Sequence, residues 1–170
     1  MSAQTLRLMA FDVDGIFTDG RLYYGVEGDA LKCFHTHDGL GLKLLQASGL
    51  PVAIITGRTS AMVEHRFAEL GIAHIISGRD DKRQALEELA DALSLSLIEC
   101  GYMGDDLPDL AAGQLAGFFA SVPNACPAVI EAAHFVTVRQ GGQGAVREVC
   151  RFLLEARGFD EADLYRSVAK

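Results

Sequence analysis

The segment that decides the fold lies near the N-terminus, where residues 6–20 read LRLMAFDVDGIFTDG. It begins with a short and almost continuously apolar run over 6–11, which is typical of a strand covered on both faces of a sheet. Two carboxylates, Asp12 and Asp14, come directly after this run and are followed by Gly15. We therefore expect a buried strand that ends in an acidic loop.

The rest of the chain repeats this pattern of short apolar runs. Further strand-like runs lie at 52–56, 74–77, 98–103, 117–120 and 135–138. Segments of helical character separate them, at 39–48, 60–70, 82–93, 108–115, 127–133 and 145–157. Strands and helices that alternate in this way predict an α/β fold. The expected architecture is a three-layer, Rossmann-like parallel sheet with helices on both faces.

One segment breaks this alternation between the first strand and its helix. Residues 21–37 show no helical period, and the stretches 22–24 and 30–34 flank a turn-forming sequence at 25–29. This pattern predicts a β-hairpin inserted after the first strand. No insertion is long enough to fold above the site, so we expect no cap domain.

The composition is that of one globular domain. The chain has 170 residues, of which 49% are hydrophobic and 22% are charged, enough to build a core. No repeat or linker divides it, and we expect a single domain over 1–170. The tail at 158–170 is polar with scattered apolar residues. It is expected to be loose or to be ordered by a neighbouring subunit.

The charge and the apolar runs argue against several classes of partner. A net charge of −8 disfavours nucleic acid, whose binding depends on neutralising phosphates. No apolar run approaches the roughly 20 residues that cross a membrane. The N-terminal residues lack the pattern of a secretory signal, so we expect a cytoplasmic protein. The cysteines are expected to be reduced, because Cys33, Cys100, Cys126 and Cys150 are widely spaced.

Polar residues follow several of the predicted strands. In an open parallel sheet, ligands bind beyond the carboxyl ends of the strands, so these residues are the candidates for a site. Besides Asp12 and Asp14, they are Thr56, Gly57, Arg58, the helix-start residue Lys82, and Asp105, Asp106 and Asp109 in the segment GDDLPD. We expect all of them at one edge of the sheet.

The chemistry of this set points to a phosphate ester. Carboxylates from distant loops repel one another unless a hard cation lies between them, and oxygen ligands suit Mg²⁺. Asp12 could attack phosphorus as a nucleophile, and Asp14 could act as general acid and base. Thr56 could donate to a phosphoryl oxygen, and Lys82 could neutralise the charge that develops there. The candidate function is a magnesium-dependent phosphomonoester hydrolase.

Each motif also has a structural alternative. Asp12 and Asp14 could be turn formers, and Arg58 a surface residue at a helix start. Acidic residues are also favoured at a helix N-terminus, so at least one of Asp105, Asp106 and Asp109 is expected to be structural. The sequence does not decide between Asp106 and Asp109.

Taken together and in this order, the motifs resemble the haloacid dehalogenase superfamily of phosphatases. The matching residues are the DVDG segment at 12–15, Thr56, Lys82 and the GDDLPD segment at 104–109. The resemblance implies that Asp12 is the nucleophile and Asp14 the acid and base. It also implies that Mg²⁺ is held by Asp12, Asp105 and the main-chain carbonyl of Asp14, with Asp106 and Asp109 acting through water or as orienting residues.

A narrower resemblance covers nearly the whole chain. The segments 12–20, 38–45, 53–58 and 141–150 are similar to the 3-deoxy-D-manno-octulosonate 8-phosphate phosphatase family. Members of that family lack a cap and are homotetramers that assemble through their hairpins. The resemblance implies a phosphorylated keto-sugar acid as substrate and a role in lipopolysaccharide precursor synthesis. It also implies that Gly57, Arg58 and the segment 141–142 lie near the substrate. His37 departs from the family pattern, because a basic residue often stands at this place, and a substrate contact by His37 would change the preference for the sugar.

Three alternatives remain open at this stage. Related phosphatases act on nine-carbon keto-sugar phosphates of the sialic-acid type. A receiver-like signalling domain also uses a phosphorylated Asp, an acidic pair, a Thr and a Lys, but it places the phosphorylated Asp after a middle strand. Here the DVDG segment comes first and the GDDLPD segment late. A non-catalytic derivative would be expected to lack Asp12 or Asp14, and both are present.

Overall fold

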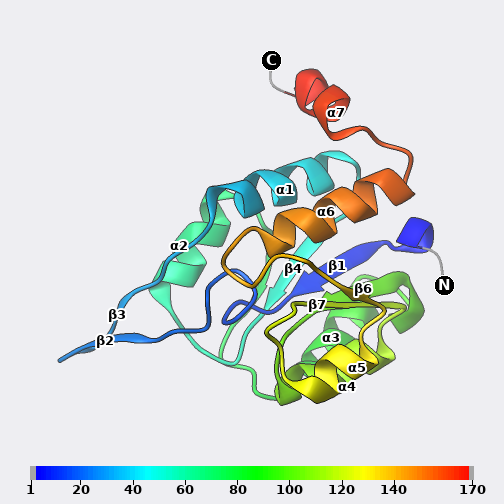
Figure 1. Ribbon diagram of the computed structural model, residues 1–170. Coiled ribbons are helices and arrows are strands. Elements are labelled where there is room, and N and C mark those ends of the chain that lie inside the picture. Colours follow the sequence, from blue (N-terminus) through cyan, green and yellow to red (C-terminus); the bar gives the residue numbers. More distant parts are fainter. Residues whose placement is uncertain (1–2, 169–170) are drawn as a thin grey trace.

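The structure is a computed structural model that describes residues 3–168. Its centre is a six-stranded sheet in the order β5-β4-β1-β6-β7-β8, with every neighbouring pair parallel (Figure 1). The strands are β1 (Leu8–Phe11), β4 (Val52–Ile55), β5 (His74–Ile76), β6 (Cys100–Met103), β7 (Phe118–Ser121) and β8 (Phe135–Val136). All six predicted strands are present, and the predicted α/β fold is confirmed.

Helices cover both faces of the sheet. They are α1 (Thr36–Ala47), α2 (Ala61–Glu69), α3 (Lys82–Ala92), α4 (Leu107–Leu115), α5 (Pro127–Ala132), α6 (Ala145–Ala156) and α7 (Glu161–Val168), with short 3-10 helices at Ala3–Thr5 and Leu97–Glu99. Helices α1 and α6 pack together on one face, while α3, α4 and α5 lie on the other (Figure 1). The three predicted layers are therefore confirmed.

The strand order places β1 at the point where the chain changes direction across the sheet. From β1 the chain adds β4 and then β5 on one side, and it returns to add β6, β7 and β8 on the other. The carboxyl ends of β1, β4 and β6 are consequently neighbours. Ligands bind at such a switch point in open α/β sheets.

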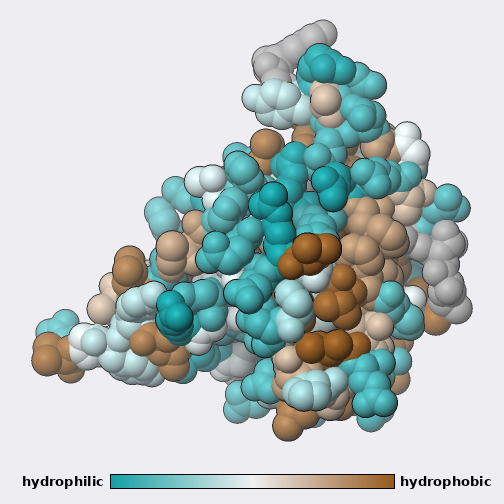
Figure 2. Space-filling model, viewed as in Figure 1, coloured by the Kyte–Doolittle hydropathy of each residue, from teal (hydrophilic) through white to brown (hydrophobic). Residues whose placement is uncertain are grey.

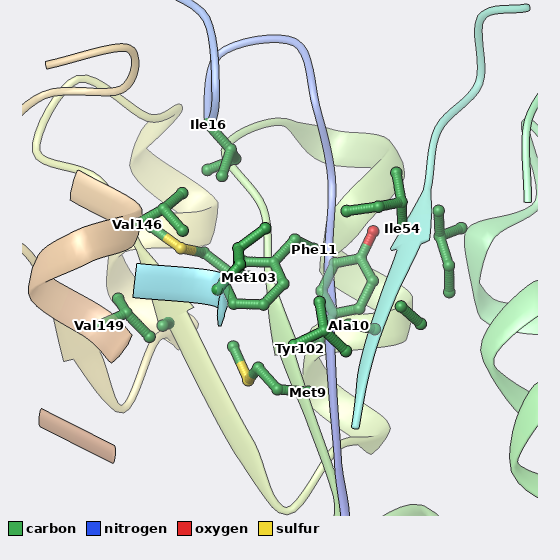
Figure 3. Packing of buried hydrophobic residues seen from close by; sticks show 14 of the residues in the cluster. Met9, Ala10, Phe11, Ile16, Ile54, Tyr102, Met103, Val146 and Val149 are labelled. Atoms are coloured by element: carbon green, nitrogen blue, oxygen red, sulfur yellow. The ribbon is translucent and has the colours of Figure 1, made fainter. Parts of the chain in front are cut away.

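The core explains why these strands are almost wholly apolar. Side chains alternate between the two faces of a strand, and here both faces are covered. On one face, Val146 and Val149 of α6 point toward the sheet, where Met103 lies (Figure 3). The neighbouring residue Tyr102 points to the opposite face and is fully buried. Every residue of β1 is buried as well, so the loop after it is anchored firmly.

The hairpin forms a separate two-stranded sheet of β2 (Tyr23–Gly25) and β3 (Gly28–Leu31). Its turn is tighter than predicted, because Gly25 pairs with Gly28 and leaves two residues between them. Gly28 adopts a φ of +112°, which permits this short turn. The hairpin projects from the body of the molecule, and apolar side chains are exposed on it (Figures 1 and 2). The predicted insertion is confirmed, and within residues 3–168 no cap domain is present.

Two segments depart most from the sequence prediction. Helix α1 begins at Thr36, three residues earlier than the predicted 39, because His35 acts as its N-cap and accepts a hydrogen bond from His37 N. Residues 158–168 of the tail are also ordered within their own chain. Asp160 accepts hydrogen bonds from the first turn of α7, and Leu164 is buried against the core.

Membrane-spanning character is absent from the described helices. In the range 3–168 none combines the length and the apolar composition that crossing a bilayer requires.

Candidate active site

The carboxyl edge of the sheet holds a pocket of about 460 Å³, within the usual range for a small-molecule site. Loops after three strands, the start of α3 and the base of the hairpin form its walls. The lining residues are Asp12, Asp14, Gly20, Leu22, Thr56, Gly57, Arg58, Asp80, Lys82, Asp105, Asp106, Pro108 and Asp109. Every predicted site residue except His37 is therefore brought to one pocket.

A buried chain of charges forms the floor of the pocket. Lys82 Nζ lies 2.8 Å from Asp12 Oδ1 and 2.7 Å from Asp109 Oδ1. The three residues are between 0% and 6% exposed. Lys82 opens α3, where a cation is disfavoured by the helix dipole, so it is these carboxylates that stabilise its charge. The lysine holds Asp12, in the loop after β1, and Asp109, in the first turn of α4, at a fixed separation.

The electrostatics of this floor favour a bound cation. Burial, reinforced by the charge on Asp109, raises the pKa of Asp12 to about 8, although Lys82 opposes the shift. Burial opposes the charge on Lys82, but Asp12 and Asp109 together raise the pKa of its ammonium group. Burial and the charge on Asp109 likewise raise the pKa of Asp105 to about 7. A cation placed among these acids would relieve the repulsion between them.

Asp105 meets the first acidic loop at Gly15. A Cβ atom built on Gly15 would lie 2.0 Å from Asp105 Oδ2, and the φ of +87° at Gly15 also disfavours a side chain. The glycine after Asp14 therefore lets the two acidic loops touch, and this contact brings Asp105 toward Asp12.

Asp109 and Asp106 are both engaged by the protein itself. Asp109 Oδ1 accepts hydrogen bonds from Lys82 and from the hydroxyl of Tyr102, and its Oδ2 accepts from the backbone N–H groups of Asp105 and Asp106. Asp106 is the N-cap of α4 and accepts from Leu107 N. Both residues thus have structural partners. Asp109 is the one that holds the backbone of the loop carrying Asp105, through the two hydrogen bonds to its Oδ2.

A metal ion fits the remaining oxygens. Asp12, Asp105 and Asp109 each have an oxygen within 4.8 Å of the others, a separation suited to a shared ion. Both oxygens of Asp109 already accept hydrogen bonds. Asp12 and Asp105 are consequently the side chains with capacity left for a hard cation, and Asp14 lines the same pocket.

The hairpin supplies partners for two of the predicted residues. Lys32, directly after β3, pairs with Asp14 Oδ1 at 2.5 Å. On β2, the hydroxyl of Tyr24 accepts a hydrogen bond of 2.9 Å from Arg58 Nη2, and the guanidinium lies 6.0 Å from the ring centre. Thr56 is buried in the pocket wall, where its hydroxyl accepts from Arg58 N.

The structure does not bring His37 to this pocket. Because α1 begins at Thr36, His37 lies in its first turn, and its ring contacts that of His35 at 4.9 Å between centres. It lines a separate recess with Arg139 and Arg147. Within one chain His37 therefore does not line this pocket, and a substrate contact by it stays a prediction.

Sequence reasoning missed several residues that support the site. Tyr102 carries no motif, and its hydrogen bond to Asp109 follows from strand alternation, which turns it toward α4. Thr18 accepts hydrogen bonds from Gly15 N and Gly20 N and so folds the first acidic loop. Lys32 and Tyr24 could be found only through hairpin register, which depends on an irregularity between Tyr23 and Tyr24.

Comparison with known proteins identifies the family. A family model for haloacid dehalogenase-like hydrolases matches residues 30–117, slightly more than half of the chain. The 3-deoxy-D-manno-octulosonate 8-phosphate phosphatase KdsC of Salmonella typhi is 43% identical over 161 residues, covering 94% of this chain and 86% of that protein. The chain belongs to this phosphatase family, among the haloacid dehalogenase-like hydrolases. Membership of a hydrolase family decides against the receiver-domain alternative.

Solved structures of this phosphatase family superpose closely on the chain. The enzyme of Moraxella catarrhalis, in complex with magnesium ion, phosphate ion and a KDO molecule, is 48% identical with a TM-score of 0.92 and covers 99% of this chain and 95% of its own. The cobalt-bound enzyme of Haemophilus influenzae is 35% identical with a TM-score of 0.93, covering 98% and 99%. The family likeness therefore spans the acidic loops and the hairpin together.

Proposed function

We propose that this protein hydrolyses 3-deoxy-D-manno-octulosonate 8-phosphate to 3-deoxy-D-manno-octulosonate and inorganic phosphate. The observation that carries the proposal is the buried arrangement in which Lys82 joins Asp12 to Asp109 at the floor of a pocket that Asp14 also lines. The relatives that match nearly the whole chain bear the name of this activity. The whole chain would act as one phosphatase domain.

The first chemical step transfers the phosphoryl group to the protein. A carboxylate oxygen of Asp12 attacks phosphorus and forms an aspartyl-phosphate, while the bond from phosphorus to the sugar oxygen breaks. The carboxyl group of Asp14 donates its proton to the departing sugar oxygen. Lys82 and Thr56 stabilise the negative charge on the phosphoryl oxygens during the transfer.

The second step regenerates the protein. Asp14, now a carboxylate, takes a proton from a water molecule whose oxygen attacks the phosphorus. The bond between phosphorus and the Asp12 oxygen breaks, and inorganic phosphate leaves. Mg²⁺, held by Asp12, Asp105 and the main-chain carbonyl of Asp14, would neutralise phosphoryl charge and orient the group for in-line attack. Asp106 and Asp109 would hold the loop that carries Asp105.

The sugar-acid end of the substrate would meet Arg58 and Gly57. Both line the pocket, and Tyr24 holds the guanidinium of Arg58 in place. A guanidinium pairs well with a carboxylate through two parallel hydrogen bonds, which suits the acid group of a keto-sugar acid. This end of the pocket decides between eight-carbon and nine-carbon keto-sugar phosphates.

We also propose a homotetramer that assembles through the hairpin. Tyr24, Val26 and Leu31 are between 55% and 106% exposed on a strand pair beside which the described residues place no further strand. Exposed apolar side chains of this kind favour burial against another protein surface. A cytoplasmic location fits the four cysteines, all of which are free thiols, as expected in a reducing compartment.

A phosphate-release screen tests the activity. The purified protein with Mg²⁺ should release phosphate from 3-deoxy-D-manno-octulosonate 8-phosphate with a higher kcat/KM than from nine-carbon keto-sugar phosphates or hexose phosphates. Asp12→Asn removes the nucleophile and should lower kcat on the order of 10⁴-fold. Absence of turnover by the wild type, or full activity of Asp12→Asn, would contradict the proposal. A preference for the nine-carbon substrates would reassign the sugar.

Sizing chromatography tests the assembly. A variant that lacks residues 23–32, and a milder Val26→Asp/Leu31→Asp variant that keeps Lys32, should both elute as smaller species than the wild type. The matched control is Ile98→Asp, because Ile98 is also an exposed apolar residue but lies far along the chain on a 3-10 helix. A tetramer that survives both hairpin changes would refute the assembly proposal.

A further inference from the structure

An ion pair joins the end of the hairpin to the active site. Lys32 follows β3 directly, and its ammonium nitrogen lies 2.5 Å from Oδ1 of Asp14. The side chain of Lys32 is only 3% exposed, and that of Asp14 is 22% exposed. Lys32 thus follows an exposed strand, but its ammonium group is buried against the carboxylate of Asp14.

This burial requires a partner. Removing an ammonium group from water is unfavourable unless the group is paired and hydrogen-bonded. Asp14 provides that pairing from the loop after β1. The ion pair therefore joins the end of β3 to the loop after β1, in which Thr18 accepts a hydrogen bond from Gly15 N.

The other carboxylate of this loop, Asp12, is also paired with a lysine. Lys82, at the start of α3, pairs with Asp12 on the floor of the pocket. Lys32 pairs with Asp14, two residues further along the same loop. Each of the two carboxylates has its own lysine, and the two lysines come from unrelated elements of the fold.

We propose that Lys32 is a positioning residue that holds Asp14 in the orientation needed for its two proton transfers. The proposal rests on the proposed function and adds a residue to it. Lys32 gives up no proton and forms no bond to phosphorus. By holding Oδ1 it leaves the other carboxyl oxygen of Asp14 to pass a proton to the sugar oxygen and then to take one from water.

The size of the effect follows from the geometry of proton transfer. A general acid or base must lie within hydrogen-bond distance of the group that it serves. A misplacement of about 1 Å costs on the order of 10²-fold in rate. Without Lys32, the side chain of Asp14 would be free to rotate away from the leaving oxygen.

The two steps respond differently when the leaving group is changed. A sugar alkoxide needs the proton of Asp14, whereas 4-nitrophenolate is a stable anion and leaves without one. Attack by water on the aspartyl-phosphate needs Asp14 as base with either substrate. Loss of orientation at Asp14 should therefore leave the first step with 4-nitrophenyl phosphate intact and slow the second.

The test uses Lys32→Met in the full chain with Mg²⁺. We expect kcat for the sugar phosphate to fall about 100-fold without a rise in KM. With 4-nitrophenyl phosphate, stopped-flow absorbance should show a burst of 4-nitrophenolate approaching one per active site, larger than in the wild type. Lys32→Arg, which keeps the charge, should recover most of the lost rate.

Two controls separate this role from a purely structural one. Lys43→Met removes an exposed lysine on α1 and should change neither the rate nor the burst. Sizing chromatography and thermal melting show whether Lys32→Met keeps the assembly and the fold. If that variant does not fold, Lys32→Gln, which keeps a hydrogen-bond donor at the position, enters the same assays.

A double variant gives the decisive comparison. If Lys32 acts only through Asp14, Lys32→Met should lower the rate of an Asp14→Asn protein by no more than twofold. A further tenfold fall there would overturn the proposal, as would a kcat of Lys32→Met within threefold of wild type, or a slow variant without a burst. A wild type that releases no phosphate from either substrate would instead refute the proposed function itself.

Discussion

The carboxyl edge of the sheet and the hairpin contribute to one pocket, but they are held in place in opposite ways. At the edge, Asp12, Lys82 and Asp109 are at most 6% exposed and are joined by contacts of 2.7 and 2.8 Å. On the hairpin, Tyr24 is 63% exposed and Val26 is fully exposed. The edge rests on a buried strand, while within residues 3–168 the two strands of the hairpin pair only with each other.

The difference in burial corresponds to a difference in the roles of the two regions. Groups that touch phosphorus need an environment that excludes water, and the buried ends of β1, β4 and β6 provide it. Tyr24, the partner of Arg58, lies on the hairpin, and Lys32, which we propose orients Asp14, follows it directly, so both come from a segment whose own packing is slight. Isolated two-stranded hairpins are marginal in water, so the hairpin depends on contacts outside itself.

The largest expected effect is a loss of stability when Lys82 at the sheet edge is replaced. Lys82→Met leaves Asp12 and Asp109 buried without their shared cation, which should destabilise the fold by about 3–5 kcal/mol. Chemical denaturation measures this, and the exposed Lys43→Met should change stability by less than about 0.5 kcal/mol. Added Mg²⁺ should restore part of the loss. Equal stability of the two variants would show that the edge is not held by this lysine.

The next effect concerns the pH dependence of metal binding. The pKa values of about 8 for Asp12 and about 7 for Asp105 mean that protons compete with Mg²⁺ near neutrality. Raising the pH removes those protons, so affinity should rise by up to about tenfold per pH unit for each proton displaced, until the pH passes the pKa values. Calorimetry in buffers of different ionisation enthalpy should detect proton release on binding. A pH-independent affinity between pH 6 and 8 would contradict this account.

The smallest effect belongs to the hairpin. Tyr24→Phe removes the acceptor for Arg58 Nη2 but keeps the ring, and one hydrogen bond to a charged group contributes about 1.5–3 kcal/mol at most. Because Tyr24 is exposed, we expect about a threefold to tenfold rise in KM for the sugar phosphate and little change in kcat. The KM for 4-nitrophenyl phosphate, which has no carboxylate, serves as the internal control. A fall in kcat with both substrates would show that Tyr24 acts on the phosphoryl end instead.

The sequence predicted the edge far better than the hairpin, for a physical reason. Asp12, Thr56 and Asp105 follow apolar strands, and in a parallel sheet the strand order alone brings such residues together. Lys82 was predicted as a residue at the start of a helix, and α3 does begin at Lys82. Nothing comparable marks Lys32 or Tyr24, whose positions depend on an irregular register between the two hairpin strands.

Two other departures have local causes. The position of His37 depended on where α1 begins, and a histidine N-cap gives a weaker signal than Ser, Thr, Asp or Asn. Helix α7 has few apolar residues, so the sequence indicates only a polar tail there. In the structure, Asp160 accepts hydrogen bonds from its first turn, and Glu161 Oε1 lies 2.9 Å from Arg147 Nε. At the start of α1 and in α7, contacts in the folded chain determine the helix, and the local sequence alone does not predict it.

The bare Cα of Gly15 has a wider consequence for how this site can change. The loop after Asp14 and the carboxylate of Asp105 meet at this point. The two segments, which are ninety residues apart in the chain, can therefore be exchanged only together. Grafting either loop alone onto a related scaffold should fail to reproduce the site, whereas moving both together should succeed. In directed evolution of this pocket, we expect tolerated substitutions at the hairpin and at Arg58. We expect few in the acidic loops, because a side chain at Gly15 would clash with Asp105.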